Sequence, residues 1–127
     1  MARSQAKGEM PLDWIGSSKR DFLTFPHAVK DEMGNALGLA QFGGMHPSAK
    51  PWKGQGPGIF ELVENYDGDT YRAVYTVRFK ELIYVLHAFQ KKSPSGIRTG
   101  QSDVDLVERR LKLAQRDYEE RHGKSKD

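Results

Sequence analysis

The residues best suited to chemistry are cations in the second half of the chain, interleaved with aromatic residues. Between residues 78 and 98 five basic side chains stand against Glu81 alone. The cationic set is Arg72, Arg78, Lys91, Lys92 and Arg98, preceded in the chain by Lys53. Cations mixed with aromatic side chains on a sheet suit the binding of phosphates and the stacking of bases. The pattern fits contact with the phosphates of a nucleic acid or with an acidic partner, and the alternative is an ordinary solvated surface, because runs of charge usually face water.

Other kinds of chemistry have no support in the residues. The chain has no cysteine, which excludes disulfides, thiolate zinc sites and a thiol nucleophile. Its four histidines are far apart and lack a metal-ligand spacing, so we expect no metal and no small-molecule cofactor. The glycine-rich stretch 54–58 precedes a predicted strand instead of opening a helix, which is the wrong context for a phosphate-binding loop.

Length and composition predict one small domain. The chain has 127 residues, a net charge of +3 and a mean hydropathy of −0.71. It contains no long apolar run and no secretory signal, so we expect a cytoplasmic protein without a membrane partner. Its organisation is predicted as a flexible arm over residues 1–11, a single domain over 12–122 and a flexible tail over 123–127.

The elements that must position the cations follow from periodicity and turn residues. A short strand at 12–15 and a helical turn at 19–24 come first, and a helix then begins at Pro26 and ends at Gly43. After a loop to residue 58, three antiparallel strands are expected at 59–66, 71–79 and 82–89, followed by a helix capped by Ser102. The predicted fold is α+β: a small antiparallel sheet, made of the N-terminal strand and the three-strand meander, packed against two N-terminal helices and a C-terminal helix.

Strand alternation predicts which side chains share a face. In the strand at 71–79, Tyr71 and Tyr75 are expected in the core together with Phe79, whereas Arg72 and Arg78 point to an open opposite face. His87 is expected to face the same way as its apolar neighbours of odd number, which favours a packed histidine over a catalytic one. The acidic stretch 61–69 and the basic stretch 78–98 are predicted to lie on different sides of the domain.

Two segments carry a resemblance to a known family. They are Tyr71-Arg72-Ala73-Val74-Tyr75 and the run from Tyr84 to Lys92, with further similarity from Leu12 to Tyr118. The chain resembles the RelE/HigB superfamily of type II toxins, in its phage-derived HigB-like branch. The resemblance implies a toxin encoded beside a helix-turn-helix antitoxin, which cleaves messenger RNA on the ribosome without a metal. In that reaction the 2′-hydroxyl of one nucleotide attacks the adjacent phosphate.

Residue roles follow from the same resemblance. Arg72 matches the arginine of the family's Tyr-Arg strand, and Lys91 with Lys92 matches the basic pair after the last strand, so these three are the predicted catalytic cations. RNA-binding roles are predicted for Lys53 and Arg98, which match positions at or near basic or aromatic residues in relatives, and for Arg78, which belongs to the basic set on the predicted strands.

The chain also departs from the family pattern. Glu61 and Val63 stand where well-studied ribosome-dependent relatives carry basic residues, so Glu61 or His87 is predicted to handle proton transfer. The superfamily includes ParE-like members that inhibit DNA gyrase without cutting RNA, and this alternative stays open. The retained pair Lys91-Lys92 favours RNA cleavage, because stabilising charge on a phosphate requires cations.

Overall fold

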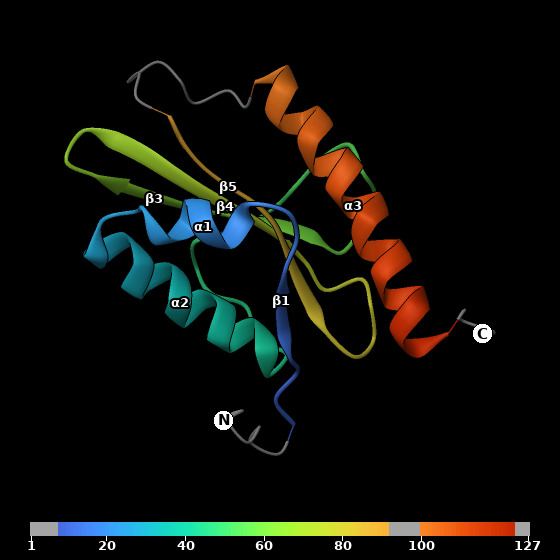
Figure 1. Ribbon diagram of the computed structural model, residues 1–127. Helices are drawn as coiled ribbons and strands as arrows, with labels where there is room; N and C mark the ends of the chain where they lie inside the picture. The colour runs from blue at the N-terminus through green and yellow to red at the C-terminus, as the bar shows by residue number, and fades with distance from the viewer. Residues whose placement is uncertain (1–7, 92–99, 124–127) are drawn as a thin grey trace.

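The structure is a computed structural model that describes residues 8–91 and 100–123 (Figure 1). Most of the arm and tail expected at the ends of the chain therefore lies outside the described residues. The elements, in chain order, are β1 (Leu12–Trp14), α1 (Ser18–Leu23), α2 (His27–Gln41), β2 (Ala49–Pro51), β3 (Ile59–Tyr66), β4 (Asp69–Thr76), β5 (Ile83–Lys91) and α3 (Gln101–His122). The α+β class is confirmed, as are the two N-terminal helices and the C-terminal helix.

The strands form one five-stranded sheet in the order β1-β5-β4-β3-β2. The pairs within the meander are antiparallel, but β1 pairs with β5 in parallel, so the sheet is mixed where an antiparallel one was predicted. Parallel pairing needs a long connection, and the helices and the meander between β1 and β5 supply it. The edge strand β2 lies in the segment predicted as a loop; its Pro51 is tolerated because an outer edge needs no further backbone donor.

Local signals fix most element boundaries. Helix α2 begins directly after Pro26 and ends before Gly43, whose φ of +87° favours glycine. The β3–β4 hairpin turns at Asp67 and Gly68, with φ values of +52° and +86°, as a two-residue turn with two left-handed positions requires. The helix α3 begins at Gln101 with Gly100 as its N-cap, two residues earlier than a cap at Ser102 would give.

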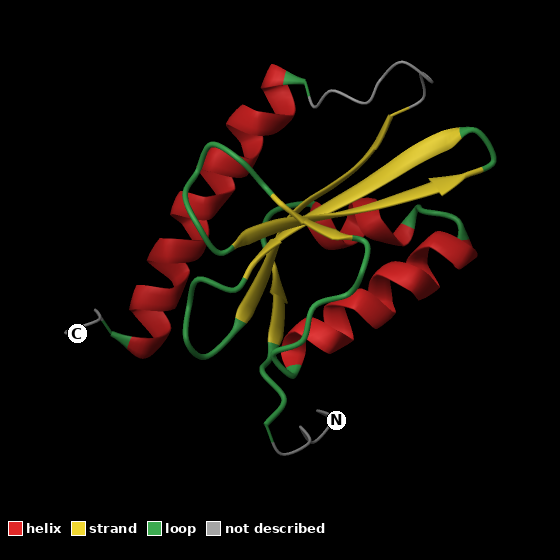
Figure 2. Ribbon diagram, turned by 180° about the vertical axis from the view of Figure 1, so that it is seen from behind, coloured by secondary structure: helices red, strands yellow, loops and turns green. Residues whose placement is uncertain are grey.

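Helices cover both faces of the sheet (Figures 1 and 2). One core lies between the sheet and the pair α1 and α2, and includes Met33, Leu62 and Tyr75; we call this side the α1/α2 face. The other lies between the sheet and α3, and includes Val74, Leu86 and Val107; we call this side the α3 face.

The prediction of an open face on β4 is therefore wrong. All residues from Tyr71 to Thr76 are buried, because α3 packs on the face that carries Arg72. Phe79 belongs to the core beneath α3, since β4 ends at Thr76 and the alternation does not continue to residue 79. Among the residues that the structure describes, no helix is long and apolar enough to cross a membrane.

Candidate functional site

The strand register gathers ionisable side chains at one end of the α3 face. Val74 of β4 pairs with Glu61 on one side and with His87 on the other. Arg72, two residues from Val74, pairs with Val63 and Phe89 and points the same way. Glu61, Arg72 and His87 thus come from three adjacent strands and lie on one side of the sheet.

Arg72 and Glu61 form an ion pair within this group. Nη1 of Arg72 donates to Oε1 of Glu61 at 2.7 Å, and the two side chains are 8% and 16% exposed. Arg72 was expected to project from the sheet into solvent, and its burial corrects that expectation. A carboxylate on the neighbouring strand makes the burial possible, because an unpaired guanidinium would be costly to remove from water.

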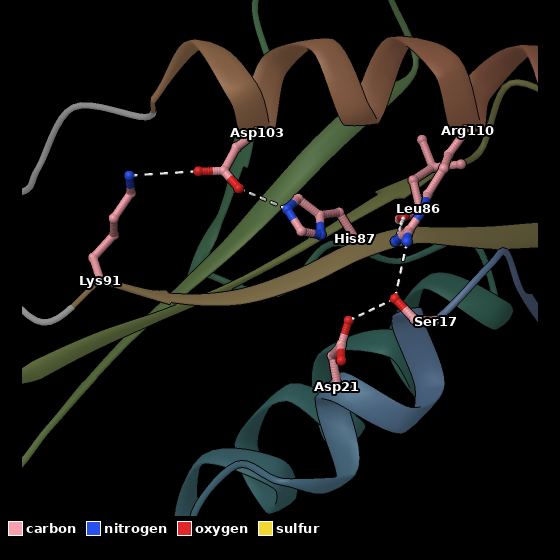
Figure 3. Close-up of polar contacts among 7 residues, drawn as sticks. All are labelled: Ser17, Asp21, Leu86, His87, Lys91, Asp103 and Arg110. Carbon is pink, nitrogen blue, oxygen red and sulfur yellow. Dashed lines mark hydrogen bonds and ion pairs between the residues drawn. The ribbon is translucent and has the colours of Figure 1, made fainter.

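Asp103, in the first turn of α3, connects two cationic or potentially cationic groups of β5. Its Oδ1 lies 2.8 Å from Nε2 of His87, and its Oδ2 lies 3.4 Å from Nζ of Lys91 (Figure 3). The ring of His87 also stacks on Phe89, with 4.4 Å between centroids. Burial lowers the pKa of His87, although the hydrogen bond to Asp103 opposes this shift. The imidazole is therefore neutral at pH 7, and Nε2 carries the proton that the carboxylate accepts.

A bulge in β5 decides which face these residues occupy. The ladder pairs Tyr75 with Val85 but Val74 with His87, so Leu86 is an extra residue. His87 and Phe89 were expected to face the same way as Val85; the bulge instead turns them to the α3 face together with Lys91. The face predicted for His87 and Phe89 was wrong because strict alternation along a strand assumes that no residue is inserted.

A groove of about 500 Å³ borders this group. It lies between the β2–β3 region and the start of α3, and Glu61 forms part of its wall. The other lining residues are Lys50, Pro51, Trp52, Lys53 and Val104. Lys50 and Lys53 are both exposed, so the groove carries positive charge beside the buried ion pair.

The remaining predicted residues are not gathered here. Arg78 follows β4 at the opposite end of the sheet, where its guanidinium donates to the carbonyls of Gln55 and Pro57 at 2.5 and 3.1 Å. Lys92 and Arg98 lie outside the described residues. The structure thus brings together Glu61, Arg72, His87 and Lys91, with Lys53 at the adjoining groove.

The expected separation of acidic and basic stretches is also wrong. Thr70 pairs with Lys91, and Nε2 of Gln90 donates to the Asp69 carboxylate at 2.9 Å. The acidic hairpin turn and the basic end of β5 therefore lie at the same end of the sheet, because antiparallel pairing brings the start of β4 beside the end of β5.

Sequence reasoning did not identify Asp103 as part of the site. An acidic residue in the first turn of a helix is common for electrostatic reasons alone, so its type and place gave no distinguishing signal. Within the described ranges, no group of three or more His, Asp or Glu residues is arranged to hold a metal ion.

Comparison with known proteins supports the family and the fold expected from the sequence. The sequence profile of the family described as "Phage derived protein Gp49-like (DUF891)" matches residues 20–112. The chain belongs to this Gp49-like family. The structure of this Gp49-like chain is similar to the crystal structure of the isolated E. coli RelE toxin, with a TM-score of 0.52 and 16% sequence identity. The match covers 79% of this chain and 97% of RelE. No curated protein matches the sequence. The phage-derived family expected from the sequence is confirmed by the Gp49-like match, and the Gp49-like chain has the fold of RelE, as the resemblance implied.

Proposed function

We propose that this protein is the toxin of a type II toxin-antitoxin system and cleaves messenger RNA on the ribosome, in the cytoplasm. The observation that supports the proposal best is the grouping of Glu61, Arg72 and Lys91 on one face, beside a groove lined by Lys50 and Lys53. A phosphodiester needs cations around the reacting phosphate and an acceptor for the proton of the attacking hydroxyl. The group contains both kinds of side chain.

In the proposed reaction the 2′-hydroxyl attacks the adjacent phosphorus in line, and the 5′-oxygen of the next nucleotide takes a proton from water and leaves as a hydroxyl, giving a 2′,3′-cyclic phosphate. Arg72 and Lys91, joined by Lys92, stabilise the charge that develops on the phosphorane oxygens. The bound phosphate competes with Glu61 for the Arg72 guanidinium, since both are anionic acceptors for the same donors. Glu61 is thereby released as the proton acceptor.

The two candidates for proton transfer differ in access. Glu61 lines the groove, whereas His87 is 6% exposed and its Nε2 is engaged by Asp103. We therefore assign the general-base role to Glu61, and assign His87 to holding Asp103 and Lys91 in place. Lys53 and Arg98 are proposed to bind phosphates on either side of the cleaved bond, and Arg78, at the opposite end of the sheet, is proposed to bind a more distant phosphate of the RNA.

The proposed partner is a helix-turn-helix antitoxin that binds over the cationic end of the meander beside the start of α3, where it neutralises Arg72, Lys91 and Lys92 or displaces α3. Hydrogen exchange of the toxin with and without the antitoxin tests this. We expect new protection along β5 and in the first turns of α3. Protection confined to residues 8–40 would contradict the assignment.

Primer extension tests the cleavage itself. Purified protein is added to messenger RNA with and without ribosomes, and the products are mapped. We expect discrete cuts only with ribosomes, and no cuts with Glu61→Gln. The nuclease assignment would be refuted if wild-type protein that arrests growth gave only full-length extension products.

One observation favours a second candidate, a ParE-like inhibitor of DNA gyrase. Both described cations of the proposed catalytic set are engaged by carboxylates, Arg72 by Glu61 and Lys91 by Asp103, which reduces the charge offered to a phosphate. Under this alternative the protein arrests growth and inhibits supercoiling by gyrase while messenger RNA stays intact. A supercoiling assay run beside the primer extension separates the two activities.

A further inference from the structure

Arg110 of α3 reaches across to the sheet and to the start of α1 (Figure 3). Its Nη1 donates to the carbonyl of Leu86 at 3.0 Å, and its Nη2 donates to Oγ of Ser17 at 2.9 Å. The Ser17 hydroxyl in turn donates to the carboxylate of Asp21 at 2.8 Å. One guanidinium therefore joins three elements that are distant in sequence.

The β5 residue that Arg110 contacts is the inserted residue of the bulge. Val85, directly before it, has a carbonyl that accepts from the backbone N–H of Ile15 at 3.0 Å and from Oγ of Ser18 at 3.1 Å. Leu86 has no partner in the β4–β5 ladder. A buried carbonyl without a hydrogen-bond donor raises the free energy of the fold. By donating to the Leu86 carbonyl, the Arg110 guanidinium therefore stabilises the bulge.

Regular pairing defines the state that competes with the bulge. If Leu86 paired with Val74, each following residue of β5 would move by one position and change face. His87, Phe89 and Lys91 would then turn toward α1 and α2, away from Asp103 and from Arg72. The arrangement of the site depends on the bulge.

The surroundings of Arg110 are shaped to hold it. Gly16 has a φ of +59°, and a Cβ at this position would come within 2.8 Å of Nε of Arg110. A glycine is therefore required for the guanidinium to lie against the backbone before α1. Arg109, its neighbour on α3, is exposed and provides a comparison of the same residue type.

We propose that Arg110 is a positioning residue: by binding the Leu86 carbonyl and the Ser17 hydroxyl, it holds the bulge that turns His87, Phe89 and Lys91 onto the α3 face. The effect on RNA cleavage rests on the function proposed above. The effect on the geometry of β5 does not depend on it.

The test compares Arg110→Met with Arg109→Met, each studied below its melting temperature. The ¹⁵N shifts of the His87 imidazole report whether Nε2 still carries the proton donated to Asp103. We expect that signature to be lost in Arg110→Met, with messenger RNA cleavage per folded molecule reduced about tenfold or more, since a displacement of about 1 Å at such a site is enough. Arg109→Met keeps both the signature and the activity.

Milder variants separate positioning from stability. Ser17→Ala removes one of the two acceptors, and Arg110→Lys keeps the charge with a single donating head, so both are expected to give intermediate losses of signature and cleavage. If Arg110→Met does not fold, the His87 signatures of Ser17→Ala and Arg110→Lys decide whether Arg110 positions β5. Folded variants with the wild-type His87 signature would overturn the proposal. If wild-type protein cuts no RNA, the proposed function fails, whereas the His87 signature still decides the role of Arg110.

Discussion

The two faces of the sheet are built from the same strands and differ in chemistry. The core against α1 and α2 consists of aromatic and aliphatic side chains, such as Phe25, Leu62 and Tyr71. The core against α3 is similar at its centre, but toward the start of that helix it gives way to ion pairs. Among the residues that the structure describes, the buried Arg and His side chains, Arg72 and His87, both face α3.

The two faces of one sheet can separate stability from chemistry in a small domain. Alternation along a strand lets Ala73 and Tyr75 contribute to one core while Arg72 contributes to the site. The α1/α2 face is packed with apolar side chains, whereas the α3 face combines an apolar cluster with buried charges. Changes on the two faces should therefore have different consequences.

The largest effect is expected for Leu62→Ala on the α1/α2 face. Leu62 is fully buried, so the change should lower the free energy of unfolding by about 3 kcal/mol. Urea denaturation measures it, with Leu39→Ala on the exposed side of α2 as the control expected to change little. Cleavage per folded molecule should stay near wild type. A specific loss of cleavage in the folded fraction would break the separation between the two faces.

A loss of stability of the same size is expected for Arg72→Ala on the α3 face, together with a loss of activity. It removes a buried cation from Glu61, and we expect the free energy of unfolding to fall by about 3 kcal/mol and cleavage to fall about a hundredfold. The double variant Glu61→Ala with Arg72→Ala should recover part of the stability and none of the cleavage. Arg20→Ala, an exposed change on α1, serves as the control. Wild-type cleavage by folded Arg72→Ala would remove Arg72 from the proposed catalytic group.

Lys91→Ala should reduce cleavage while leaving the stability of the domain almost unchanged. Lys91 is 22% exposed and its pair with Asp103 is long, so the free energy of unfolding should change by less than about 1 kcal/mol. Cleavage should still fall about a hundredfold if Lys91 stabilises the phosphorane. Lys80→Ala, exposed at the opposite end of the sheet, is the matched control. Equal cleavage by the two variants would contradict the role of Lys91.

The smallest expected effect is a pH dependence from His87. Its pKa is lowered in the folded protein, chiefly by burial, so the unfolded chain binds more protons below about pH 6.5. The stability contribution is complete above that pH and is lost as pH falls toward the lower, folded pKa. Melting temperatures of wild type and His87→Gln across pH 5 to 8 should therefore converge at the acidic end. Parallel curves would show that His87 does not titrate in this way.

Local patterns in the sequence were sufficient for much of the fold. Pro26 and Gly43 bracket α2, and Asp67-Gly68 marks the hairpin, because helix starts, helix ends and tight turns depend on the backbone preferences of a few adjacent residues. The resemblance carried by the Tyr-Arg strand and by the strand before Lys91 gave the family. Alternation also placed Arg72 opposite Tyr71 and Tyr75, since that property belongs to a single strand.

Tertiary structure alone decided how those elements meet. The parallel pairing of β1 with β5, the burial of Arg72 beneath a second helical layer and the bridge from Asp103 to His87 and Lys91 all join segments far apart in the chain. The bulge at Leu86 reversed the expected face of His87, and its stabilisation comes from Arg110, 24 residues away. Register and burial depend on which distant groups satisfy a strand's backbone and side chains, and those partners exist only once the helices have packed on both faces.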